Sequence, residues 1–234
     1  MTLLALERVS RRDRRGAHER MLLREVSLAV DSGELVAVWG PRHCGRSTLL
    51  RVAGGIEPPD AGTVRFAGRA LEGSDGALGR GIGYCSRGRP SGEAGGVLDE
   101  LLMTQLACGV PRTQARARSL TALERVGAAL SASRVLRELD GAEAMRVAIA
   151  RALLLEPALL LVDDPIRGVD VGARDAILAL LRSLTNEGIA VLLATDDATG
   201  LSGADRALSL SRGELRGLAS PRLAPVVQLR RASG

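Results

Sequence analysis

The chain has 234 residues, of which 46% are hydrophobic, 25% are charged and 1% are aromatic, and its formal net charge is +5. This length and balance predict one large globular domain, or one domain with an inserted lobe, built on an aliphatic core. All 32 basic residues are arginines. They are scattered, and almost no aromatic side chains are present to stack on bases, so nucleic acid is excluded as the expected partner.

The cysteines and the hydropathy pattern indicate the cellular compartment in which the protein is expected. Cys44, Cys85 and Cys108 form neither a metal-binding spacing nor an even set, which is typical of a reduced, cytoplasmic protein. No signal peptide opens the sequence, and no apolar run reaches the roughly 18 residues that a membrane span needs. Association with a membrane is therefore expected only through a partner.

The first third of the sequence is rich in predicted strands, with a turn at Ser32-Gly33 and a helix over 47–55. The run "RRDRR" at 11–15 separates two of the strands and predicts an exposed hairpin tip. Alternating or continuous apolar patterns place the strands at residues 3–10, 22–30, 34–39, 63–68 and 81–86.

The middle of the chain predicts a helical lobe at about 88–140, interrupted at 109–111 by Gly-Val-Pro. Beyond it, apolar strands alternate with helices, which predicts a parallel sheet covered on both faces. The tail over 218–234 is predicted to be irregular. The later elements are a helix over 141–155, a strand over 158–163, a helix over 171–186, a strand over 189–195 and a terminal hairpin ending near 217.

Residues 40–48 read "GPRHCGRST", close to the phosphate-binding loop G-x-x-x-x-G-K-[ST]. In such a loop, glycines let backbone N–H groups wrap phosphates, and a lysine adds positive charge. Here arginine stands at the lysine position. The candidate nucleotide-binding residues are Gly40, Pro41, Arg42, His43, Cys44, Gly45, Arg46, Ser47 and Thr48.

A second phosphate-site element follows in "LLLVDD" (159–164), an apolar strand that ends in two carboxylates. In a protein with a phosphate-binding loop, the first of these, Asp163, holds Mg²⁺ together with the loop serine, Ser47. The next, Asp164, orients or deprotonates the attacking water. Alone, the stretch fits a buried strand and a polar turn equally well, and the upstream loop favours the nucleotide site.

The long block over 139–170 resembles the signature-to-Walker-B region of ABC-transporter ATPases, with "RVAIARAL" intact at 146–153. The resemblance runs through residues 3–217 and is strongest to the branch that serves lipoprotein release, macrolide efflux and cell division. It implies an α/β fold, a P-loop NTPase of ABC type. Its parts would be a RecA-like parallel-sheet core, an N-terminal antiparallel β-subdomain and the inserted helical lobe, all within an ATP-binding domain over 1–217.

Compared with that family, the chain keeps the spacing of the motifs but differs at the positions expected to contact the nucleotide, Mg²⁺ or the attacking water. Arginine in the loop is bulkier than lysine, and an aspartate in place of the catalytic glutamate is one methylene shorter. The resemblance therefore implies that ATP and Mg²⁺ bind weakly or not at all, and that hydrolysis is impaired or absent. The changed positions are Asp13 (adenine-stacking aromatic), His43 and Arg46 (loop glycine and lysine), Arg87 (magnesium-binding glutamine, lost), Asp164 (catalytic glutamate) and Asp196 (switch histidine).

The signature of the family also differs, reading "LDGAE" with residues Leu139, Asp140, Gly141, Ala142 and Glu143. Family members offer the γ-phosphate of the opposite subunit a serine hydroxyl and an open helix N-terminus. Asp140 and Glu143 have the spacing of a capping box. We therefore expect this helix to cap itself with its own carboxylates.

The sequence thus predicts a degenerate nucleotide-binding subunit of an ABC transporter. The resemblance implies a head-to-tail pair with a second, intact ATPase subunit, docked on a membrane permease at the cytoplasmic face of the plasma membrane. Two alternatives remain open: a nucleotide-independent scaffold subunit, and an active ATPase with unusual motif residues.

Overall fold

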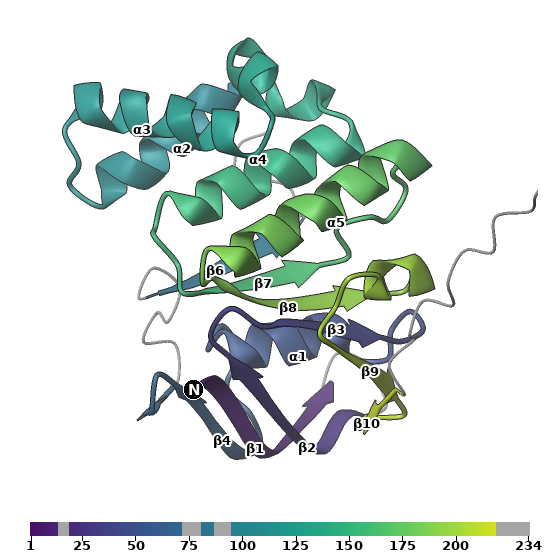
Figure 1. The fold of residues 1–234 in the computed structure, drawn as a ribbon. Helices are drawn as coiled ribbons and strands as arrows, with labels where there is room; N and C mark the ends of the chain where they lie inside the picture. The colour runs from purple at the N-terminus through teal and green to yellow at the C-terminus, as the bar shows by residue number, and fades with distance from the viewer. Residues whose placement is uncertain (14–18, 72–80, 87–94, 219–234) are drawn as a thin grey trace, which may run out of the picture.

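A computed structural model describes residues 1–13, 19–71, 81–86 and 95–218 (Figure 1). Two sheets and their helices make up this part of the chain. No helix within the described residues is long and apolar enough to cross a membrane.

The central sheet has six strands in the order β10-β9-β3-β8-β7-β6. Neighbouring strands are parallel from β9 to β6, and only β10 is antiparallel. The parallel strands read as continuous apolar runs because both of their faces are buried. Their bounds are β3 Leu35–Trp39, β6 Ile82–Ser86, β7 Leu159–Asp163, β8 Ala190–Thr195, β9 Arg206–Ser211 and β10 Glu214–Gly217.

The second sheet is antiparallel, with strands in the order β2-β1-β4-β5. Its burial pattern alternates along β2, as expected of a sheet with one face on the core. The sheet comes from β1 Thr2–Asp13, β2 Arg20–Asp31, β4 Ala61–Phe66 and β5 Arg69–Ala70. This sheet is the predicted N-terminal antiparallel β-subdomain.

Helices cover the central sheet on both faces (Figure 1). Helix α1 lies between the two sheets, whereas α4 and α5 lie on the opposite face, and α2 and α3 form the helical lobe beyond them. Three short 3₁₀ helices complete the described chain. The helices are α1 Arg46–Ala53, α2 Val97–Ala107, α3 Arg112–Arg125, α4 Gly141–Leu153 and α5 Val171–Asn186, with 3₁₀ turns at Ala129–Ser133, Leu136–Glu138 and Ala198–Leu201.

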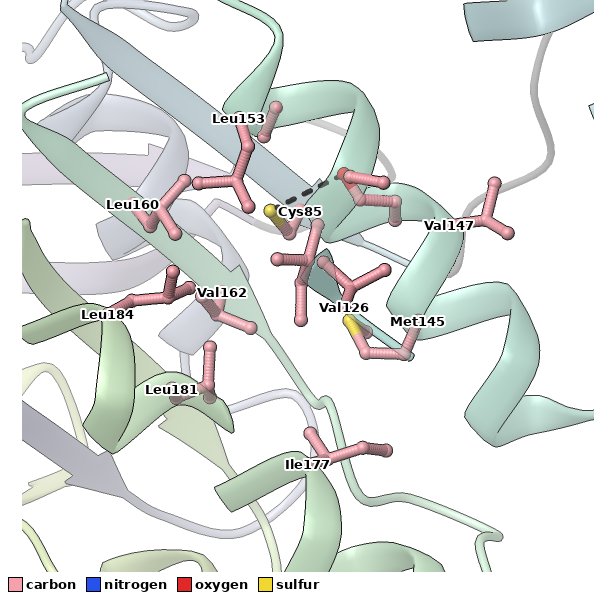
Figure 2. Close-up of a cluster of buried hydrophobic side chains, with 14 of the residues drawn as sticks. Cys85, Val126, Met145, Val147, Leu153, Leu160, Val162, Ile177, Leu181 and Leu184 are labelled. Carbon is pink, nitrogen blue, oxygen red and sulfur yellow. Dashed lines mark hydrogen bonds between the residues drawn. The ribbon is translucent and has the colours of Figure 1, made fainter. Parts of the chain in front are cut away.

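The alternation of side chains along the central strands divides the interior into two cores. Leu159 and Leu161 point to the core that contains α1, and Leu160 and Val162 point to the core under α4 and α5. Figure 2 shows the second core, where the Cys85 thiol contacts the Ala148 carbonyl at 3.7 Å. Complete burial raises the pKa of Cys85 to about 12, so this thiol is an inert packing group.

The predicted α/β fold with a parallel-sheet core is confirmed, and the break at 109–111 separates α2 from α3. The predicted hairpin tip needs a correction. Arg11 to Asp13 belong to β1 and pair with β2, and Arg11 forms an ion pair with Asp60 at 3.1 Å. The run therefore begins inside the sheet, where Arg11 has an acidic partner next to β4 and Arg12 pairs with Glu19 just before β2. Residues 14–15 and the predicted irregular tail beyond 218 lie outside the described residues.

Replacing Leu161 by alanine tests the first core. The side chain is fully buried, so we expect the free energy of unfolding to fall by about 2–5 kcal/mol. Leu130 is 94% exposed and serves as the matched control, whose alanine variant stays within about 0.5 kcal/mol of the parent. Urea unfolding followed by Trp39 fluorescence measures both. Equal midpoints for the two variants would contradict this assignment of the core.

Candidate functional site

The loop over 40–48 joins β3 to α1 and depends on two glycines. A Cβ on Gly40 would lie 2.4 Å from the Leu210 carbonyl oxygen. Gly45 has φ 109°, and a Cβ there would lie 2.6 Å from the Leu22 carbonyl oxygen. Only glycine fits at both positions. Gly45 is the N-cap of α1, which has no side-chain cap, so the first backbone N–H groups of this helix are available to an anion.

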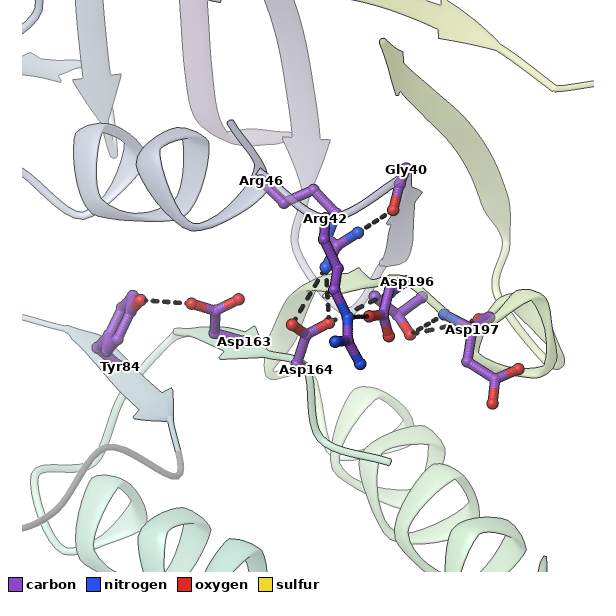
Figure 3. Close-up of polar contacts among 9 residues, drawn as sticks. Gly40, Arg42, Arg46, Tyr84, Asp163, Asp164, Asp196 and Asp197 are labelled. Atoms are coloured by element: carbon purple, nitrogen blue, oxygen red, sulfur yellow. Dashed lines mark hydrogen bonds and ion pairs between the residues drawn. The ribbon is translucent and has the colours of Figure 1, made fainter. Parts of the chain in front are cut away.

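Arg46, at the lysine position of the loop, is buried with 6% of its side chain exposed. Its Nη1 donates to the Gly40 carbonyl oxygen. Its Nη2 donates to both carboxylate oxygens of Asp164, each at 3.1 Å (Figure 3). The guanidinium is therefore held across the loop by its own chain.

Asp164 sits at the carboxyl end of β7 with φ 47°, a left-handed conformation that aspartate tolerates. Burial raises the pKa of its carboxyl group, the charge of Arg46 opposes that effect, and Asp196 and Asp163 add to it. The Asp196 backbone N–H also donates to Asp164 Oδ1 at 3.2 Å. Both oxygens of the expected catalytic carboxylate thus have partners within the chain.

A second ion pair lies beside the first. Arg42 Nε donates to Asp196 Oδ2 at 3.1 Å, with side-chain exposures of 63% and 18%. Figure 3 shows the two pairs next to each other at the carboxyl ends of β7 and β8. We call Arg42, Arg46, Asp164 and Asp196 the ion-pair quartet. It joins two loop cations to two carboxylates, one at the expected catalytic position and one at the expected switch position.

Asp163, the expected magnesium ligand, points away from the quartet toward Tyr84 (Figure 3). The Tyr84 hydroxyl donates to Asp163 Oδ2 at 3.0 Å, and Asp163 Oδ1 is buried with no hydrogen-bond partner. Burial, followed by the charge of Asp163, raises the pKa of Tyr84. The phenol therefore stays protonated and keeps donating to the carboxylate.

A hollow of about 530 Å³ opens beside the loop. Ser47 lines it and Asp163 does not. Arg87, at the third expected magnesium position, lies outside the described residues. Within them, no three His, Cys, Asp or Glu side chains are grouped to hold a metal. The described residues therefore do not fit a magnesium ion as they lie. The hollow is lined by Asp13, Arg20, Leu22, Pro41, Arg42, His43, Cys44, Gly45, Arg46, Ser47, Thr48, Arg51, Asp164 and Arg167.

The predicted capping box at the start of α4 is confirmed. Asp140 Oδ1 accepts from the backbone N–H groups of Ala142 and Glu143 at 2.8 Å, and Glu143 Oε2 accepts from the Asp140 N–H at 3.0 Å. Arg134 donates to the other Glu143 oxygen and to the Glu138 carbonyl oxygen. The positive end of this helix is thus occupied by its own carboxylates, in contrast to α1.

The sequence assigned the loop, both carboxylates of β7 and Asp196 to one nucleotide site, and the structure places them at the carboxyl ends of β3, β7 and β8. Sequence reasoning missed the pairing of Arg42 with Asp196 and the bond from Tyr84 to Asp163. The second had a partial signal, because 81–86 and 158–163 were both predicted to be strands, although their parallel pairing was not predicted. The first had none, since a surface arginine can reach many acceptors.

An ABC transporter family model matches residues 23–167, more than half of the chain. The chain belongs to the ABC transporter family.

Its relatives within this family include ATP-binding proteins of several systems. The lipoprotein-releasing system ATP-binding protein LolD of Shewanella sp. (strain MR-7) is 34% identical over 223 residues, which cover 93% of this chain and 96% of LolD. The molybdenum import ATP-binding protein ModC of Mycobacterium tuberculosis (strain CDC 1551 / Oshkosh) is 37% identical over 208 residues, which cover 82% of this chain and 55% of ModC. The chain therefore matches about half the length of ModC but nearly all of LolD.

Among solved structures, the dimeric ATP-binding cassette MJ0796 bound to ADP and Pi is similar, with a TM-score of 0.82 and 24% sequence identity. The match covers 93% of this chain and 99% of that one. This similarity shows that the ABC transporter chain has the fold of an ATP-binding cassette.

Removing the Asp140 carboxylate tests the cap of α4. Asp140→Ala leaves two backbone N–H groups without their acceptor, so we expect a loss of about 1 kcal/mol in the free energy of unfolding. Asp140→Asn keeps a capping oxygen without the charge and should retain most of the parent stability. Urea denaturation compares the three proteins. An Asn variant as unstable as the Ala variant would mean that the charge, rather than the hydrogen bonds, stabilises the helix.

Proposed function

We propose that the chain is a degenerate nucleotide-binding subunit of an ABC transporter, in which ATP hydrolysis is impaired or absent. The ion pair between Arg46 and Asp164 carries this proposal. One of these residues stands where the loop cation should bind phosphate, and the other where a carboxylate should act on water. Each neutralises the other, so neither is available for its role.

The cost of separating the pair supports this proposal. Hydrogen bonds to charged groups contribute about 1.5–3 kcal/mol, and Arg46 makes such bonds to Asp164 while also binding Gly40. An incoming phosphate would have to replace these contacts before Arg46 could bind it. A water beside Asp164 would also have to compete with Arg46 and with the Asp196 N–H.

The start of α4, which carries the signature residues 139–143, supports the same proposal. In a head-to-tail pair, the start of α4 would lie against the phosphate site of the partner, where Asp140 brings a negative charge. Two unit charges about 4 Å apart interact by roughly 4 kcal/mol at an effective dielectric of about 20. The chain would therefore weaken both sites of a pair, including one formed with an intact second ATPase subunit.

The relatives indicate the kind of transporter complex to which the chain would belong. They are ATP-binding proteins of systems for lipoprotein release, molybdenum import and Fe(3+) import. The match to nearly all of LolD favours a subunit of that type, docked on a membrane permease at the cytoplasmic face of the plasma membrane. Since the systems carry different cargoes, the cargo is left open.

A nucleotide-independent scaffold is the second candidate, because the ion-pair quartet satisfies the loop charges without a ligand. Equilibrium binding of a fluorescent ATP analogue, with and without Mg²⁺, separates the two. Saturable binding favours the nucleotide-binding subunit, and no binding favours the scaffold.

Steady-state release of phosphate from ATP and Mg²⁺ tests the impairment directly. We expect the purified chain to release phosphate no faster than its Asp164→Asn variant, because Asp164 is held by Arg46. Arg118→Gln, which changes an exposed arginine of α3, controls for the loss of one surface charge. Turnover that is brisk in the parent and abolished by Asp164→Asn would overturn the proposal in favour of an active ATPase.

A further inference from the structure

We propose that the hollow beside loop 40–48 binds an oligophosphate chain that carries no magnesium, and that it does so without recognising a base. The inference rests on the proposed function, because it concerns the same site and names the class of ligand. It follows from the charges that line the hollow, the open end of α1 and the orientation of Asp163.

Positive charge dominates the lining of the hollow, where the described residues include five arginines and two aspartates. Three of the arginines have acidic partners: Arg42 pairs with Asp196, Arg46 with Asp164, and Arg51 with Glu57 at 2.7 Å. The other two, Arg20 and Arg167, form no ion pair within the described residues. They are exposed, and a multiply charged anion in the hollow would pair with both.

The backbone adds donors to these cations. Helix α1 begins at the floor of the hollow, where Arg46, Ser47 and Thr48 line it, and no side chain caps this end. The buried Nε of Arg46 also has no acceptor. Backbone N–H groups at a helix start and a buried guanidinium donor both favour a phosphate oxygen. The closed start of α4 shows that this chain can cap a helix end with carboxylates, and it does not do so at α1.

Among the described residues, magnesium has no comparable set of ligands. It prefers several oxygen ligands in octahedral geometry. Asp163 is turned to Tyr84 and is absent from the lining, and Asp164 is bound by Arg46. Arginines around the hollow supply the positive charge that a metal would otherwise bring to the phosphates. A chelated phosphate carries less negative charge and keeps its metal-bound waters, so it fits this lining less well.

The lining also offers nothing that selects a base. None of the described residues that line it is aromatic, and Asp13 occupies the position where an aromatic side chain is expected to stack on adenine. Stacking on aromatic rings is the main sequence-tolerant contact to a base. The phosphate chain, shared by a nucleoside triphosphate and by inorganic tripolyphosphate, is therefore the part that is bound.

Calorimetric titration of the full chain with sodium tripolyphosphate and with ATP, each in EDTA and in excess Mg²⁺, tests the proposal. We expect both ligands to bind in EDTA with dissociation constants that agree within about threefold, because neither gains base stacking. Excess Mg²⁺ should weaken both by about tenfold or more, the effect of losing one charge-assisted contact.

Two variants test whether tripolyphosphate binds to the two arginines that form no ion pair within the described residues. Arg167→Gln and Arg20→Gln change exposed side chains that line the hollow, so the fold is expected to persist, and each should weaken tripolyphosphate binding in EDTA by about tenfold. Arg118→Gln removes an exposed arginine outside the hollow and should leave the binding unchanged.

Several outcomes would overturn the inference. They are binding that requires Mg²⁺, binding of ATP without tripolyphosphate, absence of binding to either, and an equal effect of all three arginine variants. Each of these leaves the proposed loss of hydrolysis standing. Conversely, magnesium-dependent turnover that Asp164→Asn abolishes would overturn the proposed function, so the two failures are distinguishable.

Discussion

The ion pair between Arg46 and Asp164 is the interaction on which the site depends. It connects the start of α1 to the carboxyl end of β7, and the side chain of Arg46 is only 6% exposed. Burying a charge is unfavourable unless the charge is paired and hydrogen-bonded. Asp164 and the Gly40 carbonyl oxygen meet that requirement, so the guanidinium that the family resemblance assigns to a phosphate is paired within the chain itself.

The starts of α1 and α4 differ in a way that side-chain chemistry explains. Helix α4 begins with Asp140 and Glu143, whose carboxylates accept its first N–H groups. Helix α1 begins after Gly45, which has no side chain to accept them. The helix macrodipole favours an anion at the N-terminus of each of these helices. At α4 the anion belongs to the protein, and at α1 it has to come from outside.

Sequence patterns predicted the fold closely, because the periodicity of apolar residues determines which faces can be buried. The strand predicted over 158–163 is observed as Leu159–Asp163, and the helix predicted over 171–186 has those bounds. The capping box of α4 was also predictable from the sequence, because it depends only on two residues three positions apart. Long side chains were not predictable in this way. Arg46 reaches Asp164 and Arg42 reaches Asp196 across more than a hundred residues, and only the folded sheet edge sets which acceptor is within reach.

The changed residues at the sheet edge form one coupled set. Burial raises the pKa of Asp164, and the carboxylates of Asp196 and Asp163 add to that effect, so all three disfavour the charged form of Asp164. The charge of Arg46 opposes that effect at Asp164, and Arg42 pairs with Asp196 directly. Removing the partner of Arg46, Asp164 or Asp196 would leave a largely buried charge unpaired, whereas Arg42 is 63% exposed and loses less without its acid. None of the four is among the aliphatic members of the two cores, so the set can differ from the family pattern while the framework persists. The quartet therefore lies outside both cores and joins the two loop arginines to the residues at the expected catalytic and switch positions.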